Sequence, residues 1–188
     1  MNRLAGRARP WPAARLARIA AGALLVALTA AGAGPARPPA GGSLEGVSIR
    51  TLDGERFELA GALARGPVLL DFWATWCRPC ERSLPGTQAL HERFRERGLT
   101  VIGVSVDGPR NWARVRPFAR RLGLTFPLVL DEDGSLSRRF RVVGIPTTVL
   151  IAGDGRIVRT HTGWVPGEED SLAAAVAALL ETGTPAKP

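Results

Sequence analysis

Cys77 and Cys80 are the residues of this 188-residue chain whose type and spacing most directly indicate chemistry. They are its only two cysteines, and two residues separate them. They follow an apolar run at 68–73, which predicts a buried strand, and they stand where a helix should begin. Two thiols at this spacing could form a stabilising crosslink, hold a metal ion or exchange a disulfide with another protein.

A crosslink and a metal site both fit the chain poorly. In the loop-entropy model a four-residue loop gains only about 2 kcal/mol, against about 3 kcal/mol for a fifteen-residue loop. Structural zinc requires four ligands, and the chain has no second cysteine pair and only two histidines, His91 and His161, at spacings that match no zinc motif. We therefore expect no metal at this site, and no cofactor beyond a redox-active disulfide.

Disulfide exchange is the chemistry that the surroundings of the pair favour. If a helix begins near Cys77, its free backbone N–H groups and its dipole stabilise a thiolate there, and the cation of Arg78 adds to this effect. Cys77 is then the attacking sulfur. Cys80, one helical turn further on and facing inward, resolves the mixed disulfide.

Asp71 is the only charged residue inside the apolar run before the cysteines. One alternative places its side chain at a solvated edge, where it has no special role. In the other, the strand buries it, desolvation raises its pKa, and it takes and returns the proton of Cys80 during exchange. The two-residue period of a strand puts it on the same face as Trp73.

The elements around the cysteines alternate between strands and helices. We expect strands at 47–51, 56–59, 68–73, 99–106, 128–130, 148–151 and 156–162, and helices at 60–65, 77–97, 111–122, 134–140 and 168–181. Asp53 and Gly54 predict a two-residue hairpin turn, and Pro85 predicts a kink in its helix. This order predicts an α/β domain with a central mixed sheet flanked by helices and an added N-terminal β-hairpin.

The first 33 residues are typical of a targeting segment. Five arginines and no acidic residue accompany an apolar run at 19–33, which predicts a signal peptide or an uncleaved membrane anchor. The positive-inside rule then places the body outside the cytoplasm, in an oxidising compartment such as the periplasm. The expected divisions are the targeting segment 1–33, a Pro/Gly-rich linker at 34–45, the folded domain at 46–182 and a flexible tail at 183–188.

The net charge of +8 does not indicate a nucleic-acid partner. The remainder of the chain after the targeting segment carries 20 basic against 17 acidic groups, so its own excess is small. We expect a monomer that touches a membrane only if the N-terminal segment is retained.

Three motifs resemble those of thioredoxins: the run DFWATWCRPC at 71–80, Pro85, and GIPT at 144–147. The export signal, the N-terminal hairpin and GVSVD at 103–107 resemble the TlpA/ResA-like branch, whose members are extracytoplasmic thiol-disulfide oxidoreductases that often serve cytochrome c maturation. The resemblance covers about residues 46–182 and implies a thioredoxin fold.

The resemblance also implies site residues and partners. Pro146 should follow a cis peptide bond and face the cysteines, and Ile145 should offer its backbone to an extended substrate. The expected rim of the active site comprises Trp76, Arg78, Pro79, Ile145 and Pro146. Exported proteins with disulfides, such as apocytochrome c, are the implied substrates, and a membrane thiol protein is the implied electron donor, so the pair would act as a reductant.

Three departures from the pattern limit what the resemblance implies. Many TlpA/ResA-like proteins carry Asn where this chain has Asp71, and they often have a Glu where it has Ser83. The buried lysine of thioredoxin corresponds to Gly103. Proton transfer at the site should therefore depend on Asp71, without the family's glutamate or the lysine of thioredoxin.

Two other functions remain open at this stage. Related copper chaperones also bind through two cysteines, but with three residues between them and a third ligand histidine. A peroxiredoxin-like peroxidase is the other alternative, although the threonine expected shortly before its cysteine is replaced by Ala74.

Overall fold

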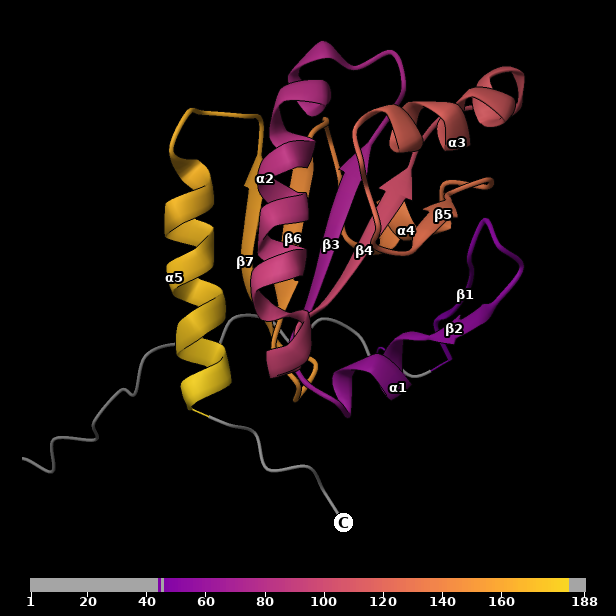
Figure 1. Cartoon of the computed structure of the whole chain (residues 1–188). Coiled ribbons are helices and arrows are strands. Elements are labelled where there is room, and N and C mark those ends of the chain that lie inside the picture. Colours follow the sequence, from indigo (N-terminus) through magenta and orange to yellow (C-terminus); the bar gives the residue numbers. More distant parts are fainter. Residues whose placement is uncertain (1–43, 45, 183–188) are drawn as a thin grey trace, which may run out of the picture. The chain divides into compact units, whose positions relative to one another are not determined.

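The computed structural model describes residue 44 and residues 46–182. Its centre is a five-stranded sheet with the order β5-β4-β3-β6-β7 (Figure 1). The strands are β3 Val68–Trp73, β4 Thr100–Ser105, β5 Leu128–Leu130, β6 Thr147–Ile151 and β7 Ile157–Thr162. The first three run parallel, whereas β6 and β7 each run antiparallel to their neighbour. The predicted mixed sheet is confirmed.

Strand β3 lies in the middle of the sheet, and all six of its residues are buried. Alternation along the strand sends Leu69 and Trp73 into one apolar cluster and Leu70 and Phe72 into the other. By the same alternation, Asp71 shares the face of Leu69 and Trp73. An ionisable side chain therefore points into the apolar cluster on one face of the sheet.

Helices cover both faces of the sheet. The cluster on the Asp71 face takes side chains from α2 Arg78–Phe94, α3 Trp112–Arg121 and α5 Glu168–Glu181. Helices α2 and α5 lie side by side over this face (Figure 1). The opposite cluster takes side chains from α1 Leu59–Leu63 and α4 Ser135–Arg139. Two short 3-10 turns, Arg95–Arg97 and Pro109–Asn111, complete the helical elements of the described residues.

The N-terminal hairpin is formed by β1 Ser48–Arg50 and β2 Arg56–Glu58. The two-residue turn predicted at Asp53 and Gly54 is wrong in its length. Gly54 N donates to Thr51 O at 3.0 Å, and Thr51 N donates to Glu55 O at 2.9 Å, so three residues form the loop. Only Gly54 among them has a positive φ, at 86°, whereas a type I′ turn would require one at Asp53 as well.

Most other boundaries agree with the sequence within one or two residues. Helix α5 is confirmed as Glu168–Glu181, and β5 as Leu128–Leu130. The helix expected at 77–97 begins one residue later and ends earlier, because its last turn tightens into the 3-10 turn Arg95–Arg97. The targeting segment, the C-terminal tail and the linker apart from residue 44 lie outside the described residues. Within 44 and 46–182, none of the helices has the length and apolar character needed to span a bilayer.

Candidate active site

Cys77 and Cys80 form a disulfide at the point where β3 leads into α2. Cys77 is the N-cap residue of the helix, and its sulfur accepts a hydrogen bond from the backbone N–H of Cys80 at 3.2 Å. A helix N-terminus presents free N–H groups and a positive dipole end, which stabilise a thiolate. Cys77 retains 5% of its surface exposed, whereas Cys80 is fully buried. Cys77 is therefore the more accessible sulfur of the two, and the roles of attacking and resolving sulfur stay predictions.

Asp107 fixes the loop that carries Cys77, and sequence reasoning missed this role. Its Oδ2 accepts from the backbone N–H of Thr75 at 2.8 Å and from Ser105 Oγ at 2.9 Å. Its Oδ1 accepts from Thr75 Oγ1 at 2.7 Å. The signal was available: Asp107 follows β4, which runs parallel to β3, so both strands end at the same edge of the sheet.

Asp71 is fully buried in β3, the strand that leads into the Cys77–Cys80 disulfide. Its Oδ2 accepts a hydrogen bond from Thr87 Oγ1 at 2.7 Å, while its Oδ1 has no partner among the described residues. Burial raises the pKa of Asp71 from 3.8 to about 7, and the hydrogen bond from Thr87 opposes this rise only in part. The solvated-edge alternative is wrong, and a carboxyl that titrates near neutral pH is suited to general acid-base work.

Thr87 is the second functional residue that the sequence did not identify. It lies seven positions after Cys80 in α2, so the two side chains share the helix face that covers β3. Both are buried. This spacing brings Cys80 and the hydroxyl that binds Asp71 to the same side of the helix. The i, i+7 relation was a usable signal once Asp71 was assigned to the core.

The rim of the site contains the cis-proline loop. The bond between Ile145 and Pro146 is cis, as the resemblance implied. The register of β6 on β3 pairs Thr147 with Phe72, which places Pro146 at the sheet edge where β3 leads toward the cysteines. Gly163 N donates to Pro146 O at 2.8 Å and ties this loop to the end of β7.

Three predicted rim residues lie at the surface beside the disulfide. Trp76, immediately before Cys77, is 59% exposed. Arg78 and Pro79 are also exposed and form the first residues of α2. An exposed indole next to a nearly buried sulfur offers an apolar contact to an approaching protein.

The positions that depart from the family pattern have structural explanations. Ser83 Oγ donates to the Cys80 carbonyl at 3.1 Å, so it bonds backwards within its own helix. Opposite Asp71 in β4 stands Gly103, where an added methyl group would lie 2.7 Å from Leu128 Cδ2 and 2.8 Å from Phe126 Cε2. Apolar side chains therefore fill the space through which a lysine at this position would reach Asp71.

The described residues contain no cluster of three or more His, Cys, Asp or Glu side chains arranged to bind a metal ion. His161 is partly exposed and lies beside Glu168. His91 packs edge-on against Phe126, with ring centroids 5.9 Å apart, and desolvation lowers its pKa. Neither histidine lies in a set of ligands with the cysteine pair.

Residues 41–160 match the model of the AhpC/TSA family. The thiol-disulfide oxidoreductase ResA of Halalkalibacterium halodurans is 37% identical over 115 residues, which are 61% of this chain and 64% of that protein. ResA of Geobacillus thermodenitrificans is 35% identical over 121 residues, which are 64% of this chain and 68% of that protein. The chain therefore spans about two thirds of the length of these relatives.

The crystal structure of StoA from Bacillus subtilis aligns with a TM-score of 0.58 and 27% identity, covering 68% of this chain and 92% of that one. The match confirms the thioredoxin-like fold predicted from the sequence, and the ResA relatives confirm the resemblance to the TlpA/ResA-like branch.

Proposed function

Since the chain belongs to the AhpC/TSA family, we propose that it is an extracytoplasmic thiol-disulfide oxidoreductase whose Cys77/Cys80 pair exchanges with disulfides of exported proteins. The observation that carries this proposal is the Cys77–Cys80 disulfide at the N-terminus of α2, directly after the strand in which burial raises the pKa of Asp71 to about 7. A carboxyl in this state can accept and return one proton near neutral pH. The ResA relatives are named thiol-disulfide oxidoreductases, which is the same activity.

The reaction begins with the reduced pair. The thiolate of Cys77 attacks one sulfur of a substrate disulfide, forms a mixed disulfide and expels the other substrate sulfur as a thiolate. The Cys80 thiol then gives its proton to the Asp71 carboxylate, and the resulting thiolate attacks the Cys77 sulfur. The second substrate cysteine leaves as a thiolate, so two electrons pass from the pair to the substrate. The Cys77–Cys80 disulfide is the product on the enzyme.

Binding would use the rim around the disulfide. An extended segment of the substrate would lie across Ile145 and the cis-Pro146 loop, and the exposed indole of Trp76 would cover its apolar side chains. Arg78, next to the nucleophile, would stabilise its thiolate. The pair itself would be the only redox group that this reaction needs.

The physiological direction is proposed to be reductive. The substrates would be exported proteins such as apocytochrome c, and a thiol protein of the membrane would return electrons to the pair. Residues 1–33 would export the body, as a cleaved signal peptide or as a membrane anchor. The described domain would act as a monomer.

A trapping experiment tests this function. Reduced protein should reduce insulin disulfides, and Cys77→Ser should abolish that activity. Cys80→Ala, which keeps the nucleophile but removes the resolving thiol, should accumulate a mixed disulfide at Cys77 in cells. Mass spectrometry of the captured proteins would identify the substrates. Insulin reduction by Cys77→Ser at the parent rate would refute the proposal.

A further inference from the structure

A row of polar side chains crosses the sheet from Asp71 to its edge strand. The register pairs Asp71 of β3 with Thr148 of β6, and Thr148 with His161 of β7. Residues directly opposite one another in neighbouring strands point to the same face. Asp71, Thr148 and His161 therefore lie next to one another beneath α2 and α5, and the row leads from the centre of the sheet to the surface.

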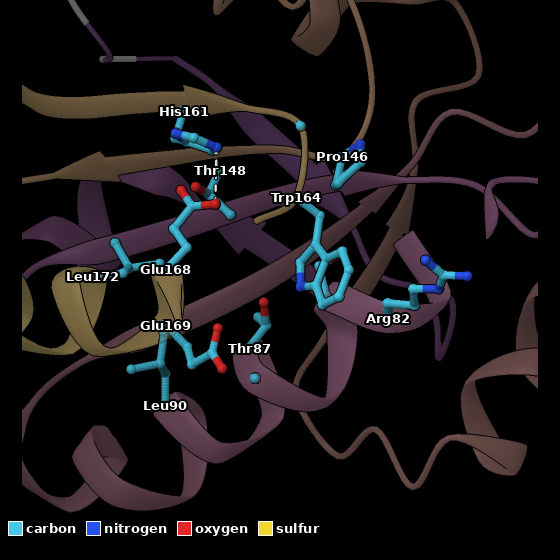
Figure 2. A pocket seen from close by; sticks show the side chains of 13 residues that line it. Arg82, Thr87, Leu90, Pro146, Thr148, His161, Trp164, Glu168, Glu169 and Leu172 are labelled. Atoms are coloured by element: carbon cyan, nitrogen blue, oxygen red, sulfur yellow. Dashed lines mark ion pairs between the residues drawn. The ribbon is translucent and has the colours of Figure 1, made fainter. Parts of the chain in front are cut away.

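A cavity of about 80 Å³ lies over this row (Figure 2). Its lining includes Thr87, Thr148, His161 and Glu168, and Pro146 of the active-site rim also borders it. A cavity of this volume has room for more than one water molecule, and the polar side chains on its lining could bind such waters. It thus extends from the hydroxyl that binds Asp71 to the side chains at the edge of the sheet.

Asp71 has a single hydrogen-bonded connection to its surroundings within the part of the chain that the structure describes. Thr87 Oγ1 is that connection, at 2.7 Å from Oδ2, and the other carboxyl oxygen is unpartnered. Because Asp71 is fully buried, a proton on it cannot pass directly to bulk water. The hydroxyl of Thr87, which lines the cavity, is the first group that could relay it.

A partly exposed pair of titratable side chains stands at the far end of the cavity. His161 Nε2 lies 2.8 Å from Glu168 Oε2, at ion-pair distance, and the two side chains are 30% and 15% exposed. Figure 2 shows this contact above Thr87, with Trp164 beside Arg82. His161 Nε2 is itself buried, so exchange of a proton with solvent would use the exposed atoms of these two side chains.

The other charged groups near this pair belong to three elements. Arg159 of β7 lies 3.9 Å from Glu168, and Arg82 of α2 stacks 5.7 Å from the ring centroid of Trp164. Glu169 of α5 also lines the cavity. The surroundings thus carry both signs, and His161 with Glu168 is the pair that shares the row with Asp71.

We infer that Thr87, Thr148, His161 and Glu168 form a proton route between Asp71 and solvent. The inference rests on the proposed function, because the proton that travels is the one that Cys80 gives to Asp71 during resolution. The electron pair of the Cys80–H bond stays on sulfur and forms the new bond to Cys77. The proton passes from Asp71 through the hydroxyls and the cavity to His161 or Glu168, and then to water. The route runs in reverse when the pair is reduced again.

A two-step reaction with a small aromatic disulfide, dithiobis(nitrobenzoate), separates attack from resolution. Attack by Cys77 releases the first coloured thiolate, and resolution by Cys80 releases the second. At about pH 6.5 Asp71 starts mostly protonated and has to lose its proton before it can accept that of Cys80. Loss of the route should therefore slow the second phase and leave the first unchanged.

The test compares three route variants, His161→Gln, Glu168→Gln and Thr148→Val, with two controls. Thr160→Val alters β7 on its opposite face, and Asp170→Asn alters the first turn of α5 at an exposed residue outside the cavity lining. In the route variants the second phase should slow about tenfold, since proton transfer by positioned groups contributes at least that much. Added imidazole should restore it in His161→Gln, and both controls should match the parent.

Each outcome decides one of the two proposals. Absence of the first phase in the parent protein would refute the proposed function. A normal first phase with an unchanged second phase in all three route variants would overturn the proton route alone. The proton route would also be overturned if imidazole did not restore the second phase in His161→Gln. The same holds if Asp170→Asn slowed the second phase as much as the route variants do.

Discussion

Two buried aspartates, Asp107 and Asp71, lie in the elements around the cysteine pair, and they differ in the number of hydrogen bonds that they accept. Asp107 receives three hydrogen bonds on its carboxylate, from Thr75 N, Thr75 Oγ1 and Ser105 Oγ. Asp71 receives one, from Thr87, and its second oxygen has no partner among the described side chains and backbone. Both residues are almost completely inaccessible, so burial alone does not distinguish them.

The number of donors determines what each carboxyl does. A carboxylate that accepts several hydrogen bonds is held in one position, and in this way Asp107 anchors the loop before Cys77. A carboxylate with one donor is poorly compensated for desolvation, so burial raises the pKa of Asp71 to about 7. The site thus combines a fixed acid that positions the nucleophile with a titrating acid that moves a proton.

The largest expected effect is on the pH dependence of stability. The folded protein holds the Asp71 proton more tightly than the unfolded chain does, because its pKa is raised from 3.8 to about 7. The protonated Asp71 contributes fully to the free energy of unfolding below pH 3.8. This contribution is lost as the pH rises toward 7, and the total loss is about 4 kcal/mol. Asp71→Asn should remove this loss. Urea unfolding of the oxidised proteins at several pH values measures the difference between parent and variant, and a difference independent of pH would contradict the comparison.

Asp107→Ala should destabilise the protein by about 3 kcal/mol at neutral pH, since buried donors on Thr75 and Ser105 lose their acceptor. Asp107→Asn keeps one acceptor oxygen and serves as the matched control, with a smaller loss. Urea midpoints would measure both. Equal stability of Asp107→Ala and the parent would show that these hydrogen bonds do not anchor the loop.

Gly103→Ala should destabilise by about 2 kcal/mol, because the added methyl group meets Leu128 and Phe126 at less than contact distance. In this account, the packing of Leu128 and Phe126 against Gly103 leaves no room for a second hydrogen-bond donor to Asp71. Thermal unfolding would measure the effect, with Gly108→Ala as a control at a position with open space. If Gly103→Ala matched that control, the packing account of the unpartnered oxygen would fail.

The smallest predicted effect concerns the single donor of Asp71. Thr87→Val removes the hydrogen bond that lowers the pKa of Asp71, so this pKa should rise further. The pH-dependent loss of stability should then extend to higher pH than in the parent. The same urea series measures this shift, and a shift to lower pH would reverse the assigned role of Thr87.

The sequence was sufficient to predict the mixed sheet, the helix that begins at the cysteine pair and the burial of Asp71, because each depends on local pattern. An unbroken apolar run with one acid in it indicates a buried acid, and a Cys-x-x-Cys after a strand indicates a helix N-terminus. The three-residue hairpin loop was missed, because Asp-Gly is compatible with more than one turn and φ at Asp53 decides between them.

Contacts between distant segments could not be predicted in the same way. Thr75 and Asp107 are 32 positions apart, and only the parallel pairing of β3 and β4 brings them together. The row from Asp71 to His161 depends on two strand registers, which no local pattern determines. The cis bond before Pro146 was implied by resemblance, since an X-Pro sequence is compatible with both isomers.

The pH profile of the resolution step tests the role of Asp71 most directly. In the parent protein, the rate at which Cys80 resolves a mixed disulfide at Cys77 should rise through an inflection near pH 7, as Asp71 loses its proton. In Asp71→Asn the step should be slower by about 10²-fold above that pH, and the inflection should be absent. An inflection near pH 7 that persists in Asp71→Asn would contradict the account.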